Sequence, residues 1–336
     1  MKKLLVIRND KLGDFMLAWP SFAMLKQSMP NTKLVALVPP YTAKMAQICP
    51  YLDDIIIDTK ELTETVKKVK AEQFDGVISF VSDIYNAKLV WIANIPYRLA
   101  PATKLIQFLY NHRVTQRRSR SEKAEFEYNL DLVRAFLTKH HIQIIEPQLP
   151  FLRFDNTLLK QQKEKLCLQL NLDPNKKWLF VHSSTGGSAN SLSLEQYTEL
   201  ITAILKHYDC QVILTAGPNE SDRVNALAEL INDQRVVVYD KNEGMVDFAQ
   251  SLACADLFIS GSTGPLHISG ALNIPTIGFY PSRRSALPIR WQPTNDPACH
   301  IAFCPPATKE TERDLTVISI AKALMEILPF VGKMWQ

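Results

Sequence analysis

The residues best suited to chemistry lie near the start of the chain, in the stretch LLVIRNDKLGDFMLAWP. An apolar run at 4–7 has the composition of a buried strand, and the loop after it carries Arg8, Asp10 and Lys11 before a helix opens near Asp14. Open α/β sheets bind ligands outside the carboxyl ends of their strands. Asp14 is therefore a candidate catalytic residue, although the helix dipole alone also favours an acid at a helix start.

Two loops in the second half of the chain combine glycines with hydroxyl side chains. Backbone N–H groups and hydroxyls at the start of a helix bind anions, so two such loops in one domain suit a diphosphate. Neither loop fits the Walker A or GxGxxG pattern. A plain connecting loop is the alternative for 183–191, and core packing is the alternative for His267. The candidates are Ser184, Thr185, Gly186 and Gly187 in the first loop, and Ser262, Thr263, Gly264, Pro265 and His267 in the second.

One acid and one basic window complete the set of candidates. Glu220 comes after an apolar run at 211–214, where acids of dinucleotide folds accept hydrogen bonds from ribose hydroxyls. No acidic residue occurs from 84 to 121, which favours an anion site over a solvated charged face. The window matches no nucleic-acid motif. Its last part, 112–123, has the composition of a surface loop. The cations singled out in or next to this window are Arg98, Arg113, Arg117, Arg118, Arg120 and Lys123.

Short apolar runs alternate with helical patterns along the chain, which predicts an α/β fold with parallel sheets. Proline-interrupted sequence between 144 and 155 indicates the junction of two domains. We expect an N-terminal Rossmann-like domain at 1–156, a C-terminal one at 157–314 and a final amphipathic helix at 315–336 that packs back toward the N-terminal domain. The expected strands are 4–7, 33–38, 55–57, 76–81, 178–182, 211–214, 236–239, 256–259 and 275–279.

Composition narrows the class of protein. With 336 residues, 46% hydrophobic and 21% charged, the chain is expected to be globular and soluble. Six scattered cysteines without CxxC spacing, no signal-peptide pattern and no long apolar stretch favour a cytosolic location. Residues 1–155 hold 22 Lys and Arg against 16 Asp and Glu, whereas the remainder holds 16 against 18. The first half is therefore expected to face an anionic partner.

The opening VIRNDKLGDFMLAWP resembles the R-x-x-x-x-G-D-x-x-x-x-x-P signature of the ADP-heptose:lipopolysaccharide heptosyltransferases, glycosyltransferase family 9. The segment ADLFISGSTGPLHISGALNIPTIGFYP is similar to the second signature of that family, and SRSEKAEFEYNLDL to its Lys/Glu-rich helix ahead of the domain junction. The three segments cover both halves of the chain.

The resemblance implies a GT-B fold, with two Rossmann-like doubly wound domains facing a central cleft. It implies an inverting transfer of heptose from ADP-heptose to the Kdo/heptose inner core, with Asp14 as general base and with neither metal nor cofactor. The C-terminal domain would bind the donor. The N-terminal domain would bind a Kdo-containing lipid A acceptor, with Arg8 and Lys11 joining the basic residues above, at the cytoplasmic face of the inner membrane. No nucleic acid is implied as a partner.

Two departures from the family pattern concern the donor. The family often has a Lys or Arg that contacts the phosphates, but the comparable place in this chain carries Asn190 and Ser191. The Asp that usually precedes Thr-Gly-Pro is Ser262 here. Lys11, Arg283 or Arg284 could supply the missing charge. The alternatives are a GT-B enzyme for another nucleotide sugar, including an epimerase, and a non-catalytic nucleotide-sugar-binding protein.

Overall fold

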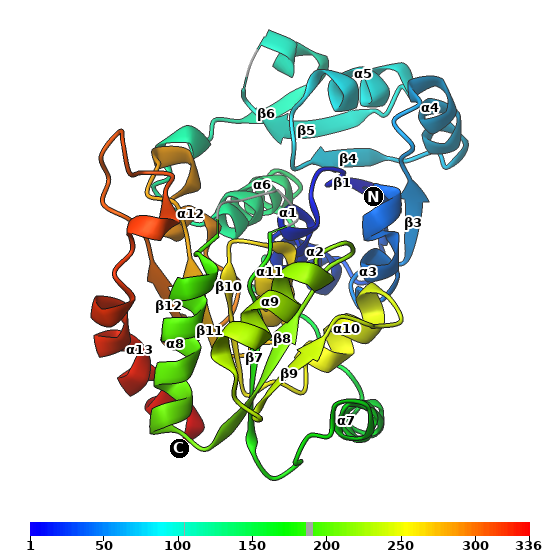
Figure 1. Cartoon of the computed structure of the whole chain (residues 1–336). Helices are drawn as coiled ribbons and strands as arrows, with labels where there is room; N and C mark the ends of the chain where they lie inside the picture. The colour runs from blue at the N-terminus through cyan, green and yellow to red at the C-terminus, as the bar shows by residue number, and fades with distance from the viewer. Residues whose placement is uncertain (104, 186–190) are drawn as a thin grey trace. The chain divides into compact units, whose positions relative to one another are not determined.

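The computed structural model describes residues 1–103, 105–185 and 191–336. The chain forms two compact units, Met1–Leu152 and Arg153–Gln336. The division falls four residues before the boundary expected from the sequence. Figure 1 shows a sheet flanked by helices in each unit. None of the helices formed by the described residues is long and apolar enough to cross a bilayer.

The first unit contains a six-stranded parallel sheet of order β3-β2-β1-β4-β5-β6. The strands are β1 (Lys3–Ile7), β2 (Lys33–Val38), β3 (Asp54–Ile57), β4 (Gly76–Ser79), β5 (Tyr97–Pro101) and β6 (His112–Val114). The helices are α1 (Leu12–Met16), α2 (Trp19–Ser28), α3 (Ala43–Gln47), α4 (Leu62–Ala71), α5 (Ile84–Ile92) and α6 (Glu125–Lys139), with 3₁₀ turns η1 (Pro40–Thr42), η2 (Leu105–Leu109) and η3 (Arg118–Arg120). The chain leaves β1 between β2 and β4, at the point where the strand order reverses and ligands bind in such sheets.

The second unit repeats this arrangement with the order β12-β11-β10-β7-β8-β9. Its strands are β7 (Lys177–His182), β8 (Cys210–Thr215), β9 (Val236–Tyr239), β10 (Leu257–Gly261), β11 (Thr276–Phe279) and β12 (His300–Phe303). Its helices are α7 (Asn156–Leu170), α8 (Leu194–His207), α9 (Ser221–Ile231), α10 (Met245–Leu252), α11 (Gly264–Ala271), α12 (Pro288–Trp291) and α13 (Ile320–Trp335), with 3₁₀ turns η4 (Arg284–Ala286), η5 (Pro297–Cys299) and η6 (Leu315–Val317). The reversal point here lies between β7 and β10.

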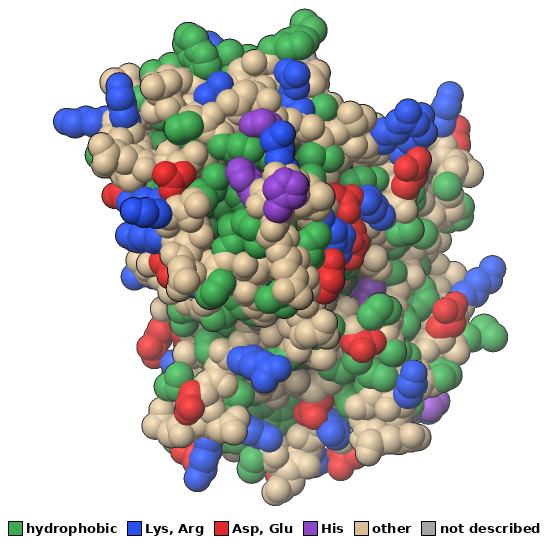
Figure 2. Space-filling model, turned by 180° about the vertical axis from the view of Figure 1, so that it is seen from behind, with side chains coloured by type: hydrophobic (Ala, Val, Ile, Leu, Met, Phe, Trp, Pro, Cys, Tyr) green, Lys and Arg blue, Asp and Glu red, His purple; other side chains and the backbone are tan. Residues whose placement is uncertain are grey.

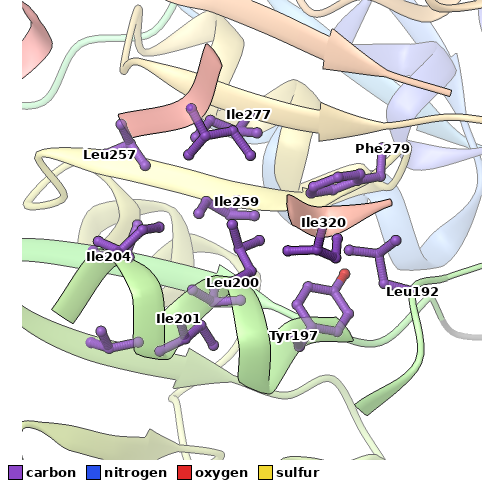
Figure 3. Packing of buried hydrophobic residues seen from close by; sticks show 14 of the residues in the cluster. Leu192, Tyr197, Leu200, Ile201, Ile204, Leu257, Ile259, Ile277, Phe279 and Ile320 are labelled. Atoms are coloured by element: carbon purple, nitrogen blue, oxygen red, sulfur yellow. The ribbon is translucent and has the colours of Figure 1, made fainter. Parts of the chain in front are cut away.

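The core of the second unit includes the C-terminal helix. Figure 3 shows Leu200 and Ile204 of α8 against Ile259 and Leu257 of β10, with Ile320 of α13 nearby. The apolar face of α13 packs against α8 within this unit. The helix α8 presents a long apolar face, and α13 covers it. Packing of the C-terminal helix toward the N-terminal domain stays a prediction.

The acid-free stretch 84–121 contains more helix and strand than its composition predicts. The expected surface loop at 112–123 contains β6 and η3, and α5 and β5 lie earlier in the window. Strand β12 was also not expected. These strands are short and β6 and β12 lie at sheet edges, so their pairing depends on the neighbouring strand more than on their own apolar content.

Candidate functional site

Asp14 lies in the short helix α1, directly after the loop that leaves β1. Its carboxylate forms an ion pair with the guanidinium of Arg8, and the two side chains are 14% and 3% exposed. The Nη1 atom of Arg8 also donates to the backbone oxygen of Phe80, at 3.3 Å. A buried arginine needs several partners to offset its lost hydration. These contacts fix the Asp14 carboxylate at the carboxyl end of the central strand.

Arg8 holds two further carboxylates. Asp10 Oδ1 lies 3.0 Å from its Nε, and Glu125 Oε1 lies 3.5 Å from its Nη1. Glu125 is 2% exposed and is shared with Arg118, whose Nη1 lies 2.6 Å away. Burial opposes the charge of Arg8, but the three carboxylates together hold its pKa above the ordinary value. The cluster Arg8, Asp10, Asp14, Glu125 and Arg118, called the Arg8 cluster below, therefore carries more acids than cations.

The pKa of Asp10 is raised in this cluster. Burial raises the pKa of its carboxyl to about 6, with Arg8 opposing and Asp14 adding to the rise. A raised carboxyl pKa means that the folded state binds the proton more tightly than the unfolded state. Stability contributed by this group is therefore present at low pH and is lost as the pH rises from about 4 to about 6.

The substitution Asp10→Asn should remove this loss. Between pH 4.5 and pH 7.5, the free energy of unfolding of the variant should improve relative to wild type by about 1–2 kcal/mol, allowing for partial solvent screening. Urea unfolding at both pH values measures this. Asp75→Asn is the control: its carboxylate accepts from the backbone N–H groups of Lys2 and Lys3, which lower its pKa. Its titration therefore lies below this pH range, and the variant should show almost no trend between pH 4.5 and pH 7.5. A pH-independent difference for Asp10→Asn would contradict the assignment.

In the second unit, polar residues occupy the ends of adjacent strands. The register places His182 of β7 beside Thr215 of β8 and Ser260 of β10. His182 Nδ1 lies 3.0 Å from Thr215 Oγ1, and its Nε2 lies 3.9 Å from Oε2 of Glu220. Glu220 Oε2 also accepts from the backbone N–H of Gly217 at 2.7 Å, an approach that a Cβ at position 217 would block.

Buried polar atoms without hydrogen-bond partners among the described residues gather after β7 and β10. They include Ser183 Oγ, Ser184 Oγ and His267 Nδ1. Burial, with a smaller effect from His300, lowers the pKa of His267 to about 3, so the ring is neutral. Buried polar groups are normally paired, and unpaired ones at strand ends indicate a ligand site.

The second expected anion-binding loop opens α11. Thr263 occupies the N-cap of α11, its side chain makes no cap hydrogen bond, and its Oγ1 lies 3.5 Å from Ser260 Oγ. Pro265 occupies the first turn, where its missing N–H costs nothing. Gly264 begins the helix, and Ser262 and Pro265 are partly exposed. Gly186 and Gly187 of the first loop lie outside the described residues, while Thr185, just before them, is partly exposed.

The predicted acceptor cations divide into two groups. Arg8 and Arg118 belong to the buried cluster, and Arg98 donates to the backbone oxygens of Leu109 and Ile95 at 2.9 and 2.6 Å. These three arginines already have partners within the protein, and their role as acceptor ligands stays a prediction. A basic run in the sequence does not reveal which carboxylates or carbonyls lie nearby in space.

The remaining cations lie nearer solvent. Arg120 lies 3.6 Å from Glu122, and Lys123 pairs with Asp131. Lys11, Arg113 and Arg117 are exposed. These five side chains remain available for an anionic ligand, because exposed ion pairs are weak and exchange readily.

Sequence reasoning missed Glu125 and His182 as members of the two sites, and Arg223. Arg223 of α9 donates to the backbone oxygens of Ser183 at 3.2 Å and Leu192 at 2.9 Å, and so places a cation at the base of the first loop. In the sequence, the only indication of a role for Arg223 is that it follows the end of a predicted strand. Glu125 was indistinguishable from an acid that favours a helix start.

Other surface features lack this convergence of chemistry. Within the described part of the chain, no three His, Cys, Asp or Glu side chains gather as a metal site would require. A depression of about 510 Å³ lies on the outer side of α8, away from the strand ends. It is lined by Glu195, Thr198, Glu199, Thr202, Ala203, Lys206 and Leu230.

The two doubly wound parallel sheets, each with polar side chains after its central strands, form the GT-B fold of solved glycosyltransferases. The chain belongs to glycosyltransferase family 9 (heptosyltransferase), whose family model matches residues 62–316. It is therefore a glycosyltransferase, as the sequence signatures predicted.

One curated relative and two solved structures are similar to this chain over nearly its whole length. A Haemophilus influenzae protein named "Putative glycosyltransferase" is 60% identical, over 100% of this chain and 99% of that protein. The crystal structure of a family 9 glycosyltransferase from Veillonella parvula matches with a TM-score of 0.81 and 13% identity, covering 99% and 97% of the two chains. E. coli ADP-heptose lipopolysaccharide heptosyltransferase II matches with a TM-score of 0.77 and 15% identity, covering 100% of both chains. At these identities the two structures confirm the GT-B fold.

Proposed function

We propose that this chain transfers heptose from ADP-heptose to the Kdo/heptose inner core of lipopolysaccharide, with inversion at the anomeric carbon and without a metal ion. The observation that carries the proposal is the Asp14 carboxylate, held by the buried Arg8 guanidinium at the carboxyl end of β1. Membership of family 9 and the likeness to a solved ADP-heptose lipopolysaccharide heptosyltransferase support the choice of substrates.

In this mechanism Asp14 is the general base. An acceptor hydroxyl attacks the anomeric carbon of the donor while its proton passes to the Asp14 carboxylate. The new carbon–oxygen bond forms as the bond to the diphosphate breaks, and ADP leaves with the electron pair. Arg8 fixes the position of the carboxylate through the ion pair between the two side chains.

The second unit would bind the donor. Ser183, Ser184 and Thr263 offer hydroxyls, and the backbone N–H groups that open α11 offer donors to phosphate oxygens. Arg223 at the base of the first loop would add a positive charge that the loop sequence itself lacks. Glu220 would accept from the ribose hydroxyls. His267, neutral and buried, would give or accept one hydrogen bond without adding charge.

The acceptor would meet the exposed cations of the first unit, chiefly Lys11, Arg113 and Arg117, which suit the carboxylates and phosphates of a Kdo-containing acceptor. We place the enzyme at the cytoplasmic face of the inner membrane as a peripheral protein, because such an acceptor is anchored in lipid. Ser262 and the cation-poor first loop favour one alternative, a GT-B enzyme that uses another nucleotide sugar.

A comparison of nucleotides tests the donor. ADP at about a hundredfold excess over its Kd should raise the Tm of the protein by roughly 5–10 °C, and UDP and GDP should raise it much less. A larger shift with UDP or GDP would replace ADP-heptose by another donor. Release of ADP only when a Kdo-containing acceptor is added would separate a transferase from a non-catalytic binding protein.

A further inference from the structure

The outer face of α5 is apolar although it faces solvent. Ile84, Trp91 and Ile92 are 60%, 56% and 43% exposed, and Lys88 is exposed between them. Their spacing puts all four on one side of the helix. The opposite side is also apolar, since Ala87, Leu89 and Val90 are fully buried in the core of the first unit. A helix that is apolar on both sides is normally covered on its outer side as well, by protein or by lipid.

The 3₁₀ turn η2 packs against α5 and extends this apolar face. Leu105 and Phe108 are 85% and 72% exposed, the highest values for large apolar side chains in the first unit. The guanidinium of Arg113 lies 5.4 Å from the centre of the Phe108 ring. We call Ile84, Lys88, Trp91, Ile92, Leu105, Phe108 and Arg113 the α5–η2 surface. Figure 2 shows apolar and basic side chains along the upper edge of the view, where Figure 1 places α5 and β6.

Positive charge predominates in this region. The sequence from 84 to 121 contains no acid, and the acid just before it, Asp83, is bound to the backbone N–H and side-chain amide of Asn86. The neighbouring helix α4 carries Lys67, Lys68 and Lys70 against one acid, Glu64, which pairs with Lys68. Exposed apolar side chains surrounded by cations match the chemistry of an anionic lipid surface, where Trp favours the interface.

We propose that the α5–η2 surface docks the enzyme on an anionic lipid bilayer. Trp91, Leu105 and Phe108 enter the boundary between headgroups and acyl chains, while Lys88 and Arg113 contact lipid phosphates. The inference rests on the proposed function in one respect: a lipid-anchored acceptor gives a reason for the docking. The docking itself follows from the exposed side chains and their charge.

Flotation with vesicles tests the docking. Wild-type protein should float with phosphatidylcholine–phosphatidylglycerol vesicles, much less with phosphatidylcholine alone, and less as salt increases. Leu105→Ser, Trp91→Ser and Phe108→Ser should each weaken the partition coefficient about tenfold, the loss that accompanies withdrawal of one large apolar side chain from lipid. Lys88→Gln should weaken it about fivefold.

Leu168→Ser is the matched control, because Leu168 of α7 is 88% exposed in the second unit, against 85% for Leu105. It should leave flotation unchanged. Equal flotation of Leu105→Ser and wild type, or no binding to anionic vesicles, would overturn the proposal. So would a stable dimer in solution that Leu105→Ser dissociates, since the surface would then join two copies of the chain.

Activity on a delipidated, water-soluble acceptor separates this inference from the proposed function. Leu105→Ser, Trp91→Ser and Lys88→Gln should keep wild-type transfer rates on that acceptor, because these exposed side chains belong neither to the Arg8 cluster nor to the proposed acceptor cations. Transfer without vesicle binding would reject the docking and keep the transferase. Vesicle binding without transfer of any heptose would reject the transferase and keep the docking.

Discussion

Asp14→Asn is expected to lower kcat by about 10²–10⁴-fold, the contribution typical of a positioned general base. The amide cannot take the proton of the acceptor hydroxyl, but its oxygen can still accept from Arg8, so the fold and the donor site should be retained. Initial rates of ADP release, with donor and acceptor varied separately, measure the effect. The loss should appear in kcat, with the KM for the donor changed little.

Asp10→Asn is the matched control for this substitution, because Asp10 pairs with the same guanidinium. It should lower kcat less than about tenfold, since Asp10 only adjusts the field around Arg8. The assignment of the base would be wrong if Asp10→Asn caused the larger loss, or if Asp14→Asn kept near wild-type rates. An unchanged Tm shift with ADP in both variants would show that the donor site is intact.

The strands near the middle of each sheet could be predicted from the sequence alone. β1, β2 and β7 are apolar runs flanked by polar loops, because strands buried on both faces must be apolar throughout. The edge strands β6 (HRV) and β12 (HIAF) could not, because they lack the run of β-branched residues that marks the edge strands β3 (DIII) and β9 (VVVY). Their backbone groups are satisfied by a neighbouring strand, and a single sequence does not say which neighbour that is.

The candidate base could also be predicted, whereas its surroundings could not. Asp14 and Arg8 are six residues apart, and their strand–loop–helix setting indicates a site. Glu125 lies 117 residues from Arg8, so nothing local connects the two. Arg118 belonged to a conspicuous basic run, and only the fold shows that its charge is taken up by Glu125. The sequence shows how many more basic than acidic residues a segment has, but it does not show which of them form ion pairs in the fold.

The second large effect concerns the cation at the centre of the Arg8 cluster. Arg8→Met should lower the free energy of unfolding of the protein by about 3–5 kcal/mol, because it leaves the buried carboxylate of Glu125 and the largely buried one of Asp14 without their shared counter-charge. Arg8→Lys should cost less, since it keeps the charge but loses the planar fork. Urea unfolding at neutral pH measures both.

The variant Arg118→Met separates this effect from the simple loss of an arginine. Arg118 also pairs with Glu125, and it donates to Gln116 and to the backbone oxygen of Phe80. Its removal should therefore cost roughly 1–3 kcal/mol, the penalty for one weakened charged hydrogen bond. A loss as large as that of Arg8→Met would show that Glu125, not Asp14, is the group that Arg8 chiefly stabilises.

A double substitution tests the cause of the Arg8 effect. If uncompensated negative charge causes the loss, Glu125→Gln in the Arg8→Met background should restore about 1–2 kcal/mol, although the same substitution destabilises wild type. The coupling has this sign only when the two side chains share one electrostatic environment. Additive losses in the double variant would mean that packing, rather than charge, makes Arg8 necessary. The guanidinium would then stabilise the fold through its packing, and its ion pair with Asp14 would add little.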